Sequence, residues 1–130
     1  MKKLIYWLPA LIYMIAIFIM SCYPSPEPAR QVPIFFEIKL VHMIEYGILC
    51  CLVIFALVNT TKLPLTNLLI LAVVITILYG ISDEAHQSLV PSRTARWQDV
   101  VANLIGSTIT AFSYWQVSQN FKSTGKPKNS

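Results

Sequence analysis

The sequence predicts an all-α integral membrane protein with four transmembrane helices arranged as an up-down bundle. Hydrophobic residues make up 55% of the chain, charged residues only 12%, and the apolar residues fall into long runs. Soluble domains carry about 25% charged residues, and a chain of 130 residues has too little interior to hide so much apolar surface. A very hydrophobic soluble bundle is the alternative, which the length of the runs disfavours.

The chain has room for one domain, expected at residues 1–120. We expect spans at about 4–20, 39–58, 63–84 and 97–117, followed by a disordered basic tail at 121–130. The prolines at positions 24, 26, 28 and 33 predict a loop between the first two spans.

The first run could instead be a cleaved signal peptide, since residues 19–22 faintly resemble a lipobox. Its apolar stretch is long for a signal sequence, and Met20 fits the motif poorly, so we expect it to be retained as a span. The three cysteines, Cys22, Cys50 and Cys51, form no CxxC pattern and predict no disulfide framework.

The net charge of +4 does not indicate a nucleic-acid partner, because the basic residues are scattered along the chain. Four spans would place six of them on the side of the termini: Lys2, Lys3, Lys62, Lys122, Lys126 and Lys128. The opposite side would hold the other four: Arg30, Lys39, Arg93 and Arg96. The positive-inside rule therefore favours a multi-pass protein of the bacterial cytoplasmic (inner) membrane, with both termini cytoplasmic.

Polar residues concentrate at the ends of three spans that an up-down bundle brings to one side of the membrane. They are Lys39, His42, Glu45 and Tyr46; Tyr79, Asp83, Glu84, His86 and Gln87; and Gln98, Asp99 and Asn103. Helical spacing places His42 with Tyr46, and Asp99 with Asn103, on shared faces. Each residue taken alone could belong to a collar of solvated side chains at the level of the lipid headgroups. The convergence of three span ends instead favours a pocket, because ionisable groups in spans are costly and usually functional.

Several motifs that suggest enzymes fail on inspection. Residues 83–86 spell DEAH, yet no phosphate-binding loop accompanies them. His42 and His86 could ligate a metal, but no spacing specifies a coordination shell, so we expect neither a metal nor a cofactor. A serine nucleophile elbow is also absent from the sequence.

The polar positions resemble the pattern of the VanZ-like family. Residues 79–93, followed by Asp99, Asn103 and Gly106, are similar to its G-x-x-x-E-x-x-Q-x-x-x-P-G-R…D-x-x-x-N-x-x-G element. Upstream, Lys39, His42 and Tyr46 resemble D-K-x-x-H-x-x-x-Y, and Ser21-Cys22 resembles a Ser-Ser pair. The chain departs from the pattern at Ile38, where the family has Asp, and at Ser92, where it has Gly; both affect local loop geometry.

The resemblance implies an envelope protein of bacteria, related to an accessory protein of glycopeptide resistance that is associated with low-level teicoplanin resistance. The positions that it transfers are the expected ligand-binding or motif residues Lys39, His42, Tyr46, Glu84, Gln87, Arg93, Asp99 and Asn103. Gly80 and Gly106 are expected to serve helix packing.

Two functions are compatible with these residues. The first is binding without catalysis: an outward-facing polar pocket that takes a membrane phospholipid headgroup, a lipid-linked cell-wall precursor or a lipoglycopeptide, with Arg93 contacting the anion and Glu84 and Asp99 orienting that arginine. The second is an intramembrane enzyme acting on a lipid or peptidoglycan precursor, with Glu84 or His42 as general base. A transporter fits less well, because no repeat or mid-membrane polar site is visible, and a purely structural bundle stays open.

Overall fold

The computed structural model describes residues 3–23, 34–91, 93 and 95–124. Throughout this part of the chain the regular structure is helical, without strands, which confirms the all-α prediction. The elements in chain order are a short 3-10 helix η1 (Leu4–Trp7), α1 (Leu8–Ser21), α2 (Ile34–Thr60), α3 (Leu65–Gln87) and α4 (Trp97–Thr124).

Local chemistry explains the helix ends. Pro9 lies in the first turn of α1, where a missing N–H costs no hydrogen bond. At the end of α2, the side chains of Asn59, Thr60 and Thr61 donate to main-chain carbonyls four residues earlier at 2.7–2.8 Å. Pro64 then adopts an extended ψ of 143° and starts α3, so the two helices are joined by a short, sharp connection.

Two helices are longer than the sequence predicted. Helix α2 begins at Ile34 rather than near 39, because no proline follows position 33 until Pro64. Helix α4 continues to Thr124, four residues into the segment 121–130 that we expected to be disordered. No glycine or proline interrupts residues 107–124, and Gly125 follows the last helical residue, a position where glycine commonly ends helices. Residues 125–130 of the expected tail lie outside the described residues.

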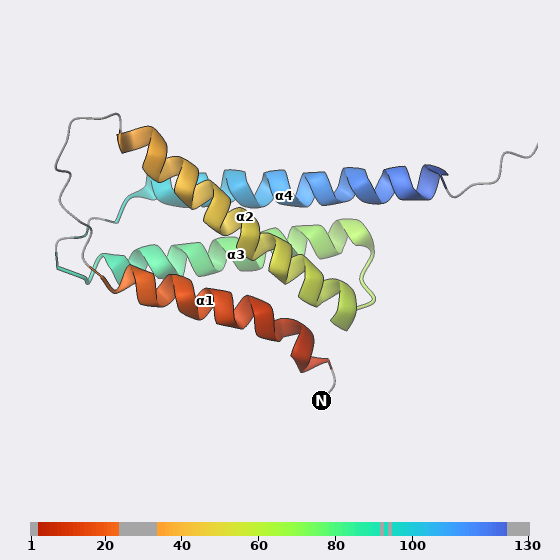
Figure 1. Cartoon of the computed structure of the whole chain (residues 1–130), viewed down its shortest axis with the longest axis horizontal. Helices are drawn as coiled ribbons and strands as arrows, with labels where there is room; N and C mark the ends of the chain where they lie inside the picture. Colours follow the sequence, from red (N-terminus) through yellow and green to blue (C-terminus); the bar gives the residue numbers. More distant parts are fainter. Residues whose placement is uncertain (1–2, 24–33, 92, 94, 125–130) are drawn as a thin grey trace, which may run out of the picture.

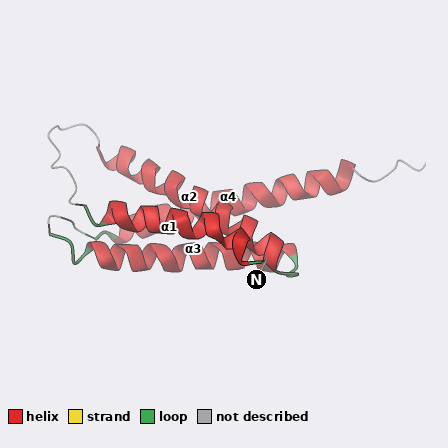
Figure 2. Ribbon diagram, turned by 60° about the horizontal axis from the view of Figure 1, so that its bottom comes forward, coloured by secondary structure: helices red, strands yellow, loops and turns green. Residues whose placement is uncertain are grey.

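Consecutive helices run antiparallel (Figure 1). At one end of the molecule Gln87 of α3 bonds Ser21 of α1, and at the other end Lys3 reaches the Thr60 carbonyl of α2 at 3.4 Å. Helix α2 lies diagonally across the others and contacts all of them, with its most extensive interface against α4. Figure 2 shows the C-terminal part of α4 extending beyond the other three helices.

Within the described residues, three helical segments are long and apolar enough to cross a membrane: Leu4–Ser21, Lys39–Thr60 and Leu65–Gln87. Only 17–44% of the residues in their most apolar windows are buried inside the molecule, so most of their apolar side chains need a cover of lipid. The interior is a thin seam of aliphatic side chains in which Leu49, Val53 and Leu57 of α2 meet Leu68 and Ala72 of α3.

Helices α2 and α4 are in close contact at Gly106. A Cβ atom at this position would overlap the main-chain carbonyl of Met43. Across the same interface a Cβ at Gly47 would meet the Thr110 hydroxyl at 3.1 Å. The small-residue face expected on α4 thus lies against the backbone of α2, as in closely packed membrane helices, and Gly47 is its counterpart on α2.

This contact predicts unequal effects of two matched substitutions. Gly106→Ala should lower the melting temperature in detergent, with a loss of about 1–3 kcal/mol from overpacking, because main-chain atoms of α2 cannot rotate away. Gly47→Ala should cost less, since the Thr110 side chain can turn aside, and both variants gain the same helix propensity. Thermal unfolding of the two variants side by side measures the difference; equal losses would contradict the close contact at Gly106.

Candidate functional site

Polar side chains from α2, α3 and α4 meet at the end of the bundle where α2 and α4 begin and α3 ends, at the left of Figure 1. We call this group the polar end. Its members are Lys39, His42, Tyr46, Asp83, Glu84, Gln87, Arg93, Asp99 and Asn103. The structure thereby brings together every predicted ligand-binding position, and their role in binding stays a prediction.

An ion pair joins the two helices that form the largest interface. The Lys39 ammonium of α2 contacts Asp99 Oδ1 in the first turn of α4. The Lys39 and Asp99 side chains are 17% and 10% exposed, so the pair is shielded from most solvent. Sequence reasoning proposed Arg93 as the cation beside Asp99; the structure places Lys39 there, because the first turns of α2 lie across the start of α4.

Glu84 links α3 to the start of α4. Its carboxylate is buried, 6% exposed, and Oε2 accepts the main-chain N–H of Arg96, just before α4, at 3.1 Å. A carboxylate at a helix N-terminus is favoured by the exposed N–H groups and the helix dipole. The second oxygen, Oε1, is buried and finds no hydrogen-bond partner in the described part of the chain.

Arg93 lies in the connection between α3 and α4. It forms no ion pair with Glu84 or Asp99, contrary to the expectation that it would hold these carboxylates. Its Nε is buried and without a partner among the residues that the structure describes. The guanidinium still lies close enough to His42 and Glu45 to act on both electrostatically. Arg93 is thus a cation at the polar end, and its Nε donor has no hydrogen-bond partner in the described chain.

A hydrogen-bonded network centred on Asp83 fixes the neighbouring side chains. Asp83 Oδ2 accepts Gln87 Nε2 at 2.8 Å and the Tyr46 hydroxyl at 3.4 Å. The same Gln87 nitrogen lies 3.1 Å from Ser21 Oγ, so α1, α2 and α3 are tied together. All four residues are 8% exposed or less. The sequence analysis counted Asp83 among the polar residues expected at this end, but it named neither Asp83 nor Ser21 as a ligand-binding position, although Asp83 and Gln87 are four residues apart on one helical face.

Asn103 lies at the centre of the three helices and is fully buried. Neither atom of its amide, Nδ2 or Oδ1, has a partner within the described chain. Gly80 makes room for it: a Cβ there would come 2.9 Å from Asn103 Nδ2 and 3.0 Å from the Tyr46 ring. A buried amide without partners is costly.

His42 adds an imidazole to the same end. Its ring stacks on Tyr46 with centroids 6.5 Å apart, and Nδ1 is buried without a partner among described residues. One ligand atom each of His42, Glu84 and Asp99 lies within 4.8 Å of the others, so these three residues could hold a metal ion. His86, the other histidine considered as a ligand, instead packs on Phe18 at 4.6 Å and lies 3.4 Å from Cys22 Sγ.

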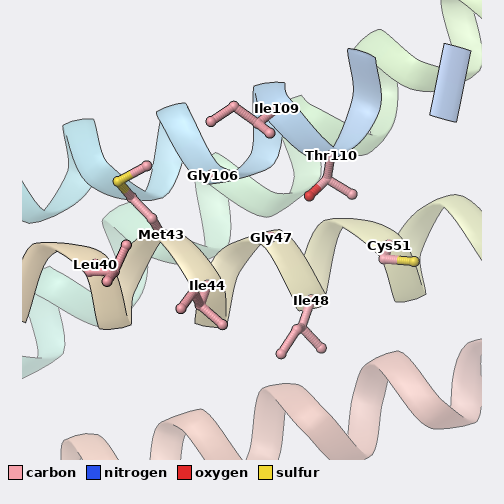
Figure 3. A pocket seen from close by; sticks show the side chains of 9 residues that line it. All are labelled: Leu40, Met43, Ile44, Gly47, Ile48, Cys51, Gly106, Ile109 and Thr110. Carbon is pink, nitrogen blue, oxygen red and sulfur yellow. The ribbon is translucent and has the colours of Figure 1, made fainter. Parts of the chain in front are cut away.

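An apolar groove of about 440 Å³ runs between α2 and α4 next to the polar end (Figure 3). It begins at Leu40, the neighbour of Lys39, and passes the close contact of the two helices. Its lining residues are Leu40, Met43, Ile44, Gly47, Ile48, Cys51, Gly106, Ile109 and Thr110. The groove is therefore a lipid-compatible surface that starts beside charged groups.

Comparison with known proteins agrees with the pattern of polar residues. The sequence model of the VanZ/LLP1 family matches residues 10–119. The chain belongs to the VanZ/LLP1 family. The matched range takes in all members of the polar end and most of the four α-helices, which confirms the resemblance seen in the sequence. Comparisons with curated proteins and with solved structures found no match.

Proposed function

We propose that this member of the VanZ/LLP1 family crosses the bacterial cytoplasmic membrane four times and binds an anionic lipid headgroup at its polar end. The headgroup would be that of a phospholipid or a lipid-linked cell-wall precursor, and binding would be non-catalytic. The observation that carries the proposal is a group of buried, unpartnered polar atoms beside two cations: His42 Nδ1, Arg93 Nε and both amide atoms of Asn103 lack partners in the described chain.

The surface of α4 supports a fourth span. The helix has 28 residues, about 42 Å of length, which exceeds the roughly 30 Å hydrocarbon core. Its polar residues Asp99, Asn103 and Ser107 are buried, so they raise the polarity of the helix without meeting lipid. Between positions 101 and 117 the exposed side chains include the apolar or aromatic residues Val101, Leu104, Ile105, Ile109, Phe112, Tyr114, Trp115 and Val117, together with the polar residues Thr108, Ser113 and Gln116.

Basic residues support an orientation with both termini in the cytoplasm and the polar end outside. In a four-span topology six lysines would lie on the side of the termini and the Lys62 connection, against four basic residues on the opposite side, and the side richer in Lys and Arg is usually cytoplasmic. The polar end would then face the leaflet in which wall precursors are used.

Cysteine accessibility in intact cells tests the orientation. On a background without the native cysteines, Lys62→Cys and Ser123→Cys should resist an impermeant thiol reagent, whereas Leu89→Cys, 80% exposed beside the polar end, should react. Labelling at positions 62 and 123 but not at 89 would place the polar end inside the cell and contradict the proposed outer site.

The headgroup and the apolar chain of a bound lipid would lie at adjacent sites on the protein. Lys39 and Arg93 supply positive charge, and His42 and Asn103 supply neutral hydrogen-bonding groups, which together suit a phosphate. An acyl or prenyl chain could leave this end along the groove between α2 and α4, whose lining is almost wholly apolar. The headgroup of such a lipid would supply hydrogen-bond partners to the unpartnered atoms of the polar end, and its chain would cover the apolar groove.

Native mass spectrometry of the gently extracted protein tests binding. The wild-type chain should retain a lipid of defined mass, and Arg93→Gln should lose most of it, because the variant removes a charge from a buried donor. Arg96→Gln is the matched control: the Arg96 side chain is exposed, and its main-chain N–H to Glu84 is kept. Equal lipid occupancy in the two variants would show that the polar end does not hold the headgroup.

An enzyme acting on the same lipid is the second candidate. It is favoured by His42 and Glu84, which each carry an unpartnered atom; one ligand atom of each residue lies within 4.8 Å of the other, so the two side chains could transfer a proton together. In the same mass spectra an enzyme would release a lipid of changed mass, whereas a binding protein would return the lipid intact.

A further inference from the structure

The sequence spacing specified no coordination shell, but the fold brings three candidate ligand residues together from three helices. His42 comes from α2, Glu84 from α3 and Asp99 from α4. One nitrogen and two carboxylate oxygens of these residues all lie within 4.8 Å of one another. Ligand atoms around a tetrahedral Zn²⁺ lie roughly 3.4 Å apart, since each is about 2.0–2.1 Å from the ion. Side-chain rotations that bring the three atoms closer together would close the set around an ion.

Independent observations indicate that a cation belongs there. Glu84 is 6% exposed, and its Oε1, like His42 Nδ1, is buried with no hydrogen-bond partner in the residues that the structure describes. A carboxylate oxygen left in this state is costly. The other Glu84 oxygen is fixed by the Arg96 N–H, as ligating carboxylates usually are, and the centroid of the His42 ring lies 6.5 Å from that of Tyr46.

We propose that His42, Glu84 and Asp99 bind one divalent transition-metal ion, Zn²⁺ or Mn²⁺. Two carboxylates balance the charge of the ion, and the imidazole selects against Mg²⁺ and Ca²⁺, which take oxygen ligands. Three protein ligands leave coordination positions open, as in catalytic rather than structural metal sites. The inference goes beyond the proposed function, although an open position at this end could also take a phosphate oxygen.

Lys39 is the competitor of the ion. Its ammonium contacts Asp99 Oδ1, so a metal ion must share this carboxylate with Lys39 or displace it. Two cations on one carboxylate repel each other. Removing the ammonium should therefore strengthen metal binding, whereas a purely structural role of Lys39 predicts no gain.

The test uses the full chain in detergent, stripped with a chelator and titrated with ZnCl₂ or MnCl₂ without added lipid, so that failure here is separate from failure of lipid binding. Calorimetry should show saturable binding of one ion per chain. His42→Ala and Glu84→Gln should each weaken it by about tenfold or more, since even the supporting residues of metal sites cost 10–100-fold. Lys39→Met should tighten it.

His86→Ala is the matched control, because His86 lies at the same end but packs on Phe18 and Cys22, and it should bind like the wild type. If a ligand variant fails to fold, Co²⁺ added to the wild-type chain should give the visible absorption bands of a site with a nitrogen ligand. No saturable binding, unchanged affinity in His42→Ala, or a loss confined to His86→Ala would each overturn the proposal.

Discussion

The close contact between α2 and α4 is the constraint on which the polar end depends. Gly106 lets the backbone of α4 touch the main-chain carbonyl of Met43. Lys39 is one helical turn before Met43, and Asp99 is two turns before Gly106, so the contact places ammonium and carboxylate opposite each other. Asn103 lies between Asp99 and Gly106 on α4 and is fully buried. A larger residue at the crossing would separate the helices and open the polar groups to lipid.

Ionisable side chains inside a bilayer are costly, and they usually pair with one another or serve a function. Asp83 is held by Gln87 and Tyr46, and Asp99 by Lys39, as expected for ionisable groups near lipid. Other atoms beside them lack partners in the described chain, including Glu84 Oε1 and the Asn103 amide. Paired groups that hold the helices together thus lie beside hydrogen-bonding atoms without partners in the described chain, next to the apolar groove between α2 and α4 (Figure 3).

The sequence predicted the helices and the end at which the polar groups gather, because both follow from apolar runs and from antiparallel connections. It did not predict which groups pair. The choice of Lys39 over Arg93 as the partner of Asp99 depends on the crossing of α2 over α4 and on a helix start at Ile34. The grouping of His42, Glu84 and Asp99 was missed because its members lie on three helices and no spacing in one segment records it. Gly47 was missed because the residues that it contacts, Thr110 and Gly106, lie on another helix.

The most direct test of the contact between α2 and α4 at the polar end is a double-mutant cycle between Lys39 and Asp99. Reversible unfolding in detergent measures the stability of each variant in the cycle. Lys39→Met and Asp99→Asn should each destabilise the protein, because each leaves a shielded charge alone. The double variant should recover part of the loss, giving a coupling free energy of about 1–3 kcal/mol. Additive effects would contradict the account, since α2 and α4 would then not be joined at the polar end and the predicted site would be a solvated collar.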